Sequence, residues 1–283
     1  MSPPVADTID GDLGRREARL FDQLRAWPSL IVAYSGGVDS AYLAWAAHRV
    51  LGSKSLAVTA DSASYPERHR EMALAIARDF GLHHEIIHTD ELQSPDYRAN
   101  NPDRCYHCKH ELFTKLAALG RSRGFAAVAD GSNADDRGDY RPGRQAAREY
   151  GVKSPLDAAA LTKAEIRALS RDAGLPTWDE PASACLSSRI PYHSEVTGEK
   201  LRAIEAAEEA MRDLGFRVVR VRHHGDLARI EVGRDELPRA TDPDLLAAIE
   251  TSLRALGFRQ VAVDPKGYRL GSLNEGLRLT PVS

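Results

Sequence analysis

Residues 30–40 read LIVAYSGGVDS, a short apolar run that passes through two adjacent glycines into an alanine-rich segment. A continuous apolar run of this length predicts a strand that is buried on both faces. The segment from Asp39 to about Val50 has the pattern of a helix, so the glycines fall at a strand-to-helix turn. There they let backbone N–H groups approach a ligand closely, and the serines add hydroxyl donors. The turn therefore predicts an anion site, most simply for phosphate; an ordinary serine-capped glycine turn is the alternative.

Apolar and helical segments continue to alternate after this loop. The expected strands and helices are 55–60, 66–80, 84–88, 108–123 and 125–130 in chain order. This alternation predicts an α/β fold with a doubly wound parallel sheet. Thr162 and Glu165 form a capping box for a further helix. Residues 175–196 then form a long irregular segment, of the kind that usually carries function.

The composition changes after the irregular segment. A helix rich in lysine, glutamate and alanine precedes two expected strands, 216–222 and 227–232, which are joined by a turn at 223–226. These strands predict a β-hairpin, and a further helix and a last strand follow it. We therefore expect two domains, 1–190 and 191–283, of which the second is a smaller α+β domain.

The charge balance limits the classes of partner. The chain of 283 residues carries 38 lysines and arginines against 41 acidic residues, a formal net charge of −3. This balance provides no overall positive field for a polyanion and argues against nucleic acid. Neither a signal-peptide core nor an apolar run long enough to cross a bilayer is present. We therefore expect a cytoplasmic protein without a membrane partner.

The loop at residues 35–40 lacks the lysine of the Walker pattern, so transfer of the γ-phosphoryl group is not indicated. Asp39 at the start of the helix is suitably placed to hold Mg²⁺. A second polar stretch, residues 131–136 with Gly131 and Asn133, follows the fourth expected strand. The carboxyl edge of a parallel sheet is where such folds bind ligands.

Three cysteines, Cys105, Cys108 and Cys185, are the only ones in the chain. The first two form a C-x-x-C, a spacing that lets one turn hold a metal or a cluster. Three interpretations stay open: a zinc site completed by His107 or His110, an iron–sulfur cluster on three thiolates, or inert thiols with Cys185 alone reactive. A cluster on three thiolates leaves one iron free to bind a substrate or an extra sulfide.

In order along the chain, these motifs resemble those of the LarE family, ATP-dependent sulfur-insertion enzymes that make the nickel-pincer nucleotide cofactor. The resemblance extends over nearly the whole chain from about Leu20. It implies the fold of the PP-loop ATP pyrophosphatases (adenine nucleotide alpha hydrolase-like). The stretches that carry it are residues 35–40, 105–109, 130–133, 139–143, 154–156 and 181–189.

The resemblance also implies a reaction. ATP adenylates a carboxylate of pyridinium-3,5-biscarboxylic acid mononucleotide, pyrophosphate leaves, and a sulfur nucleophile converts the acyl-adenylate to a thiocarboxylate. A homohexamer is implied as well, whereas the source of the sulfide is not identified. ATP and Mg²⁺ are expected to be bound by Ser35, Gly36, Gly37, Asp39, Ser40, Gly131 and Asn133.

The position that matches Cys185 is central in the family. The resemblance implies that members with this cysteine alone give up its sulfur, whereas members that also carry a C-x-x-C hold a 4Fe-4S cluster whose free iron carries the sulfide. This chain has all three cysteines, so the resemblance favours a cluster on Cys105, Cys108 and Cys185. A thiolate bound to iron is also poorly suited to losing its own sulfur. Sacrifice of the Cys185 sulfur remains the alternative.

Arg220 and Arg222 fall on one face of an expected strand, because side chains alternate along a strand. Two guanidinium groups side by side suit a nucleotide phosphate, although the pattern alone also fits a solvated polar face. The resemblance implies that both bind substrate and, with Asp39 and Cys185, act in catalysis. It implies substrate binding by Arg189 too.

Three other functions are compatible with parts of the sequence. A tRNA thiolation enzyme of the PP-loop class shares features such as residues 154–156 and the helix near Lys163, but net acidity argues against it. An amide ligase that uses ammonia would have no use for the three cysteines. A zinc-stabilised nucleotide-binding module would bind ATP without releasing pyrophosphate.

Overall fold

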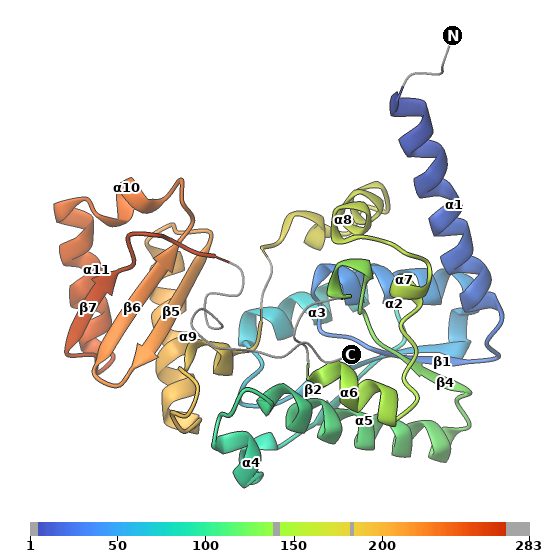
Figure 1. Ribbon diagram of the computed structural model, residues 1–283, viewed down its shortest axis with the longest axis horizontal. Coiled ribbons are helices and arrows are strands. Elements are labelled where there is room, and N and C mark those ends of the chain that lie inside the picture. The colour runs from blue at the N-terminus through green and yellow to red at the C-terminus, as the bar shows by residue number, and fades with distance from the viewer. Residues whose placement is uncertain (1–4, 138–141, 182–183, 270–283) are drawn as a thin grey trace.

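The computed structural model describes residues 5–137, 142–181 and 184–269. Within them the chain forms a four-stranded and a three-stranded sheet, which lie apart from one another in Figure 1. The strands of the larger sheet are β1 (Leu30–Ala33), β2 (Ser55–Asp61), β3 (His84–His88) and β4 (Ala127–Ala129). They are all parallel and lie in the order β3-β2-β1-β4. The predicted parallel α/β fold is confirmed.

Strand β1 illustrates why this sheet needs helices on both faces. Leu30 and Val32 belong to one hydrophobic core and Ile31 to another, and all three are buried. Successive side chains of a strand point to opposite faces. A strand that is apolar at every position is therefore stable only when both faces are covered.

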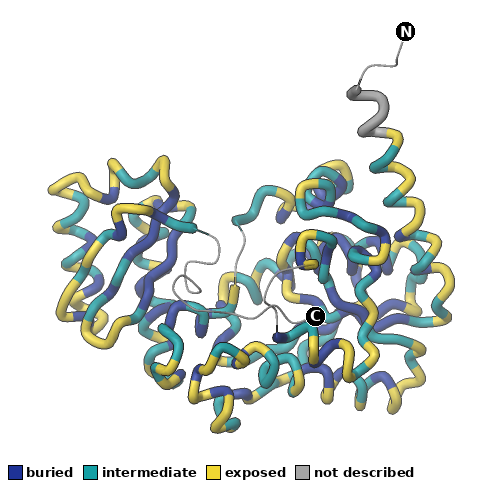
Figure 2. The backbone as a smooth tube through the Cα atoms, in the orientation of Figure 1, coloured by how far each residue is buried: buried dark blue, intermediate teal, exposed yellow. Residues whose placement is uncertain are grey.

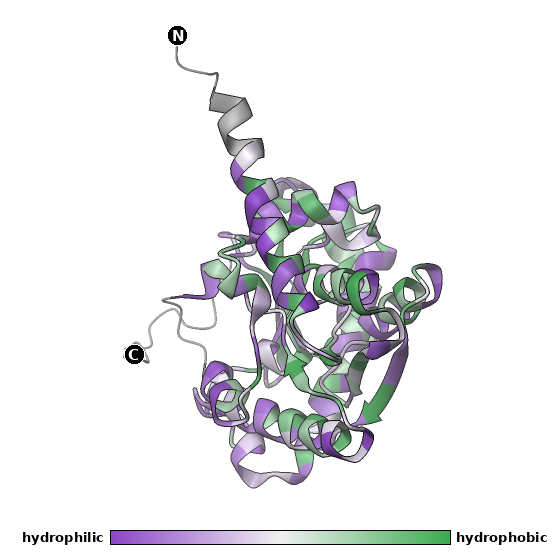
Figure 3. Ribbon diagram, turned by 90° about the vertical axis from the view of Figure 1, so that its right-hand side faces the viewer, coloured by the Kyte–Doolittle hydropathy of each residue, from purple (hydrophilic) through white to green (hydrophobic). Residues whose placement is uncertain are grey.

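Two layers of helices provide this cover. The layer over Leu30 and Val32 includes α1 (Val5–Arg25), α2 (Val38–Leu51), α3 (Glu67–Asp79), α7 (Pro155–Ala158) and α8 (Lys163–Asp172). The layer over Ile31 includes α5 (Arg104–Arg123) and α6 (Gly143–Glu149). Hydrophobic and hydrophilic residues mix along these helices, as expected for amphipathic helices (Figure 3). None of the described helices has both the length and the apolar character needed to cross a membrane.

The three-stranded sheet forms a smaller α+β part with its own core. Its elements are α9 (Gly198–Asp213), β5 (Val219–His224), β6 (Leu227–Val232), α10 (Leu237–Ala240), α11 (Pro243–Ala255) and β7 (Gln260–Val263). Strands β5 and β6 form the predicted hairpin, and β7 lies parallel to β6. Phe216, Ile230 and Leu253 are among the residues that fill its core.

A separate hydrophobic cluster joins the two parts. It contains Tyr97 of α4 (Pro95–Arg98), Leu186 of the irregular segment, and Leu201 of α9. Helix α9 also contributes Met211 to the core of the smaller part. Buried residues accordingly occur in both sheets and in the region between them (Figure 2). Helix α9 packs both in this joining cluster and in the core of the smaller part, so hydrophobic contacts continue across the region after the predicted boundary at residues 190 and 191. The division into two domains stays a prediction.

Several element boundaries differ from the prediction: β4 is confined to Ala127–Ala129 and β5 begins at Val219. Two further differences lie close to the predicted site residues. Helix α5 begins at Arg104 rather than near Cys108, so both cysteines of the C-x-x-C lie within its first turns. Strand β5 continues to His224, so the hairpin turn is confined to Gly225, with φ +64°, and Asp226. The first turn of α5 is polar, and apolar periodicity therefore gave no signal there.

Candidate active site

The loop between β1 and α2 is closed by its own serines. Ser35 N donates to Ser40 Oγ at 3.1 Å, and Ser40 Oγ donates to the carbonyl of Gly37 at 3.0 Å. Gly36 has a φ of +67°, and a Cβ at this position would lie 3.0 Å from the Cβ of Ala73 on α3. Both the backbone conformation and the close approach of α3 therefore require glycine at this position.

Asp39 lies in the first turn of α2 with its two oxygens in different surroundings. Lys163 Nζ donates to Asp39 Oδ2 at 2.9 Å. Asp39 Oδ1 is buried and has no hydrogen-bond partner in the described part of the chain. A buried carboxylate oxygen without a donor is costly, and Mg²⁺ prefers such ligands. Sequence reasoning did not select Lys163, but the confirmed capping box at Thr162 sets the start of α8 and so places Lys163 beside the loop.

The stretch after β4 packs directly against the loop. A Cβ on Gly131 would lie 3.0 Å from the backbone N of Ser40, so only glycine allows this approach. Asn133 is buried, its Oδ1 accepts from Asp135 N at 3.0 Å, and its N donates to Asp136 Oδ2 at 3.1 Å. Gly131 thus adjoins the loop, while the side chain of Asn133 caps its own turn.

Hydrogen bonds connect the loop to the segment that carries Cys185. The hydroxyl of Tyr65 donates to the carbonyl of Ser35 at 3.0 Å. The carbonyl of the adjacent Ser64 accepts from Leu186 N at 2.9 Å. Ser64 and Tyr65, which follow β2, therefore lie between the loop and the segment with Cys185. They hold this segment beside the loop, although the loop and Cys185 are far apart in sequence. Residues 139–141 and 182–183, which belong to two of the recognised motifs, lie outside the described residues.

The three cysteines are free thiols, with Cys105 exposed and the other two partly buried. Burial raises the pKa of Cys108, and Glu91, Cys185 and Cys105 raise this pKa further. Cys105 and Cys185 therefore lie close enough to Cys108 to affect its pKa.

No three His, Cys, Asp or Glu side chains of the described residues are grouped so that they could hold a metal ion. A cubane cluster has a different requirement, because each thiolate binds its own iron and the sulfurs do not meet at one point. In kind and number, the three thiols suit three irons of such a cluster.

Glu91 is a site residue that sequence reasoning missed. It follows β3 at the carboxyl edge of the sheet and is 3% exposed. Its Oε1 accepts from the hydroxyls of Ser62 and Ser64 at 2.7 and 2.5 Å. Its Oε2 is buried without a partner among the described residues. A single glutamate in a polar stretch has no periodic signal, and packing alone brings it near Cys108.

Arg189 holds the backbone around Cys185. It is 1% exposed, and its Nε and Nη2 donate to the two carboxylate oxygens of Glu208 at 2.8 and 3.1 Å. Its Nη1 donates to the carbonyls of Ala184 and Cys185 at 2.6 and 2.9 Å. These contacts give Arg189 a positioning role; its direct binding of substrate stays a prediction.

Strand β5 carries the other two predicted arginines at buried positions. Arg222 Nη1 donates to the carbonyl of Ser188 at 2.7 Å, so β5 reaches the Cys185 segment. Arg220 lies over the ring of Tyr268 at 5.0 Å. Burial lowers the pKa of Arg220 to about 10, and the Arg189 cation contributes next. Positive charge is thus costly here, which favours the binding of an anion.

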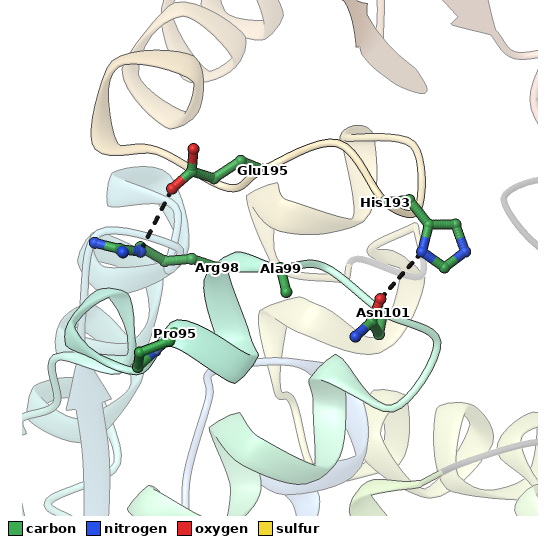
Figure 4. Close-up of a pocket in the computed structure, with 6 residues that line it drawn as sticks. All are labelled: Pro95, Arg98, Ala99, Asn101, His193 and Glu195. Atoms are coloured by element: carbon green, nitrogen blue, oxygen red, sulfur yellow. Dashed lines mark hydrogen bonds and ion pairs between the residues drawn. The ribbon is translucent and has the colours of Figure 1, made fainter.

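Two hollows in the described structure contain none of the predicted site residues. One, of about 430 Å³, lies between α4 and the segment before α9. Across it Arg98 pairs with Glu195 at 3.5 Å, and His193 Nδ1 lies 3.0 Å from Asn101 Oδ1 (Figure 4). The other, of about 570 Å³, includes Trp178 and residues of α3 and α9.

The parallel sheet, the glycine loop after its first strand and the polar residues at its carboxyl edge define a protein of the PP-loop ATP pyrophosphatase class. No family model matches the chain. An uncharacterised protein of Synechocystis sp. is 44% identical over 87% of this chain and 92% of its own length. The pyridinium-3,5-bisthiocarboxylic acid mononucleotide synthase of Lactiplantibacillus plantarum is 36% identical over 94% of this chain and 96% of its own. The chain belongs to the family of this synthase, the LarE family.

A more distant relative has the same class of fold. The tRNA(Ile)-lysidine synthase of Bradyrhizobium sp. is 27% identical over 88% of this chain and 77% of its own length. The family resemblance read from the motifs is confirmed by the synthase, and the fold class agrees with both relatives.

Proposed function

We propose that the chain is an ATP-dependent sulfur transferase. It adenylates a carboxylate of pyridinium-3,5-biscarboxylic acid mononucleotide and converts it to a thiocarboxylate in the synthesis of the nickel-pincer nucleotide. The name of the Lactiplantibacillus relative, a synthase of the bisthiocarboxylic acid, supports this. The observation that supports the proposal is the connection from Ser35 through Tyr65 and Ser64 to Leu186, because it holds the glycine loop beside the segment that carries Cys185.

In the first step a substrate carboxylate oxygen attacks the α-phosphorus of ATP, and pyrophosphate leaves. The amides and hydroxyls of residues 35–40 bind the pyrophosphate moiety. Asp39 would hold Mg²⁺, which would supply neutralisation of the phosphate charge. The loop itself contains no cation, and Lys163, in contact with Asp39, supplies one.

In the second step a sulfur nucleophile attacks the acyl carbon, and AMP leaves. We assign the sulfur to the site of Cys105, Cys108 and Cys185, because the first and the last of these lie close enough to Cys108 to affect its pKa. A 4Fe-4S cluster on these thiolates would supply an open iron able to carry a replaceable sulfide. Release of the sulfur of Cys185 itself is the alternative.

The arginines of β5 provide the substrate end of the proposed site. Arg220 and Arg222 bind the phosphate of the mononucleotide, and Arg189 keeps the backbone at Cys185 in place. The cytoplasmic location and the homohexamer implied by the family resemblance stay predictions.

The reaction is tested by following AMP, pyrophosphate and thiocarboxylate with anaerobically purified protein. We expect pyrophosphate release that depends on the pyridinium mononucleotide. Cys185→Ala is expected to retain this release and to form no thiocarboxylate. Release stimulated by tRNA instead of the mononucleotide would assign the chain to the tRNA thiolation alternative.

The sulfur source is tested by iron analysis and by product yield. For a cluster we expect about four irons per chain and more than one product per chain. Cys105→Ala is then expected to limit the yield to one product or none while pyrophosphate release persists. Tightly bound zinc without iron after anaerobic reconstitution contradicts the cluster, and loss of sulfur mass from Cys185 indicates sacrifice.

A further inference from the structure

Arg104, the first residue of α5, is a buried cation without an acidic partner among the described residues. It is 2% exposed, and its Nη1 donates to Asn100 Oδ1 at 2.5 Å and to the carbonyl of Ser187 at 2.8 Å. Both acceptors are neutral. Arg189, which is equally buried, has the carboxylate of Glu208 as its counter-ion. Arg104 therefore differs from Arg189 in that no carboxylate of the described residues pairs with it.

An uncompensated charge in a protein interior is strongly destabilising. The burial of the Arg104 cation therefore indicates that an anion neutralises its charge in the working protein. Arg104 Nη2 lies 4.0 Å from Cys105 Sγ. Its Nη1 contact with the carbonyl of Ser187, two residues after Cys185, brings the guanidinium to the Cys185 segment as well.

The guanidinium is held in a fixed orientation. Asn100, its main acceptor, has φ +55°, and its Nδ2 donates to the carbonyls of Ile190, Pro191 and Ser194 at 3.2, 2.7 and 3.0 Å. Helix α5 begins at Arg104 without a side-chain cap, so its first amides add partial positive charge beside the cysteines.

We propose that Arg104 is the counter-ion in a binding site for hydrosulfide among the three thiols. The identity of the anion rests on the proposed function, in which sulfur must reach these thiols. One guanidinium suits a small monovalent anion, whereas the substrate phosphate already has the arginine pair of β5. Exposed Cys105 lies where the anion would enter from solvent.

The charge is tested without any turnover, using the metal-free full chain. Iodoacetate is an anion and iodoacetamide is neutral, but both alkylate the same thiolate. The ratio of the iodoacetate rate to the iodoacetamide rate therefore reports the local positive potential, and the fraction of deprotonated thiol does not affect it. We expect Arg104→Gln to lower this ratio about tenfold at Cys105 and Cys185, as for loss of one nearby charge. Alkylated sites are assigned by mass spectrometry.

Two further variants separate charge from structure. Arg104→Lys keeps the charge but loses the planar guanidinium, and we expect it to restore most of the ratio. Arg98→Gln removes an exposed arginine of α4 that pairs with Glu195, and we expect no change. An unchanged ratio in Arg104→Gln, or the same loss in the Lys and Gln variants, would overturn the proposal.

A kinetic measurement identifies the anion. In sulfide-dependent turnover we expect Arg104→Gln to raise the KM for sulfide about tenfold, with the KM for ATP and pyrophosphate release unchanged. A rise in the KM for the pyridinium substrate instead would assign Arg104 to a substrate carboxylate, and the hydrosulfide site would be wrong. Absence of any thiocarboxylate with the wild-type protein contradicts the proposed function, whereas the alkylation ratio still decides the role of the charge.

Discussion

The carboxylate of Asp39 has one oxygen on Lys163 and one buried without a partner among the described residues. Residues 35–40 include no lysine or arginine, and Lys163 brings a positive charge to this loop through its contact with Asp39. We expect Lys163→Ala to slow pyrophosphate release about 100-fold, because a preorganised charge beside the leaving group is lost. Lys163→Arg should retain part of the rate. Lys115→Ala, which removes a half-exposed lysine on α5, is the control, and equal rates in the two alanine variants would contradict the assignment.

Gly36 and Gly124 both have positive φ, but only Gly36 is crowded, by Ala73. We expect Gly124→Ala to lower the free energy of unfolding by about 1 kcal/mol, the cost of a left-handed conformation. Gly36→Ala should cost about 2–3 kcal/mol and also weaken ATP binding, because α3 must shift. Urea unfolding and nucleotide titration measure both. Equal costs would show that α3 does not press on the loop.

At the scale of elements, helix α9 fixes the segment that carries Cys185. Glu208 of α9 is buried, and it accepts from Arg189 and from Val221 N of β5 at 3.2 Å. We expect Glu208→Gln to lower the free energy of unfolding by about 3 kcal/mol, because Arg189 is left as an unpaired buried charge. Cys185 should also become more accessible to alkylation.

The adjacent Glu209 provides the control for this helix. It is largely exposed and pairs with Arg212 only at the surface. Glu209→Gln should change stability by less than about 0.5 kcal/mol. Similar melting temperatures for the two variants would show that α9 does not hold the segment through Glu208.

At the scale of the whole molecule, the two parts of the chain jointly create a positive field. Burial and, after it, arginines of α3, the Cys185 segment, β5 and α9 together lower the pKa of His69 to about 4. The unfolded chain therefore takes up the proton first as the pH falls. The stability that neutral His69 provides is complete above pH 6.5 and is lost as the pH falls toward 4.

His69→Gln should accordingly flatten the loss of stability between about pH 6.5 and 4, measured by urea unfolding at several pH values. His88→Gln removes an exposed histidine and is the control. The same pH slope in wild type and His69→Gln would mean that the arginines of the two parts do not converge on this position.

Local patterns were sufficient for most elements. The apolar run at 30–34, the paired glycines and the capping box at Thr162 act over a few residues, so the strand, the loop and the start of α8 were predicted correctly. The start of α5 was not predicted correctly, because its first turn is polar and is held by contacts of Arg104 with Asn100 and Ser187. Such contacts leave no periodic signal in the sequence.

The sequence alone determined the chemical groups: a glycine loop between a strand and a helix, three thiols and a pair of arginines on a strand. Local conformation and residue type are sufficient for these. Only the tertiary structure decided which groups meet. It holds Arg189 on Glu208 and the backbone of Cys185, brings Lys163 to Asp39, and leaves Arg104 without an acid among the described residues. Partners of buried charges are set by packing between distant segments, because burial makes an unpaired charge costly wherever in the chain its partner lies.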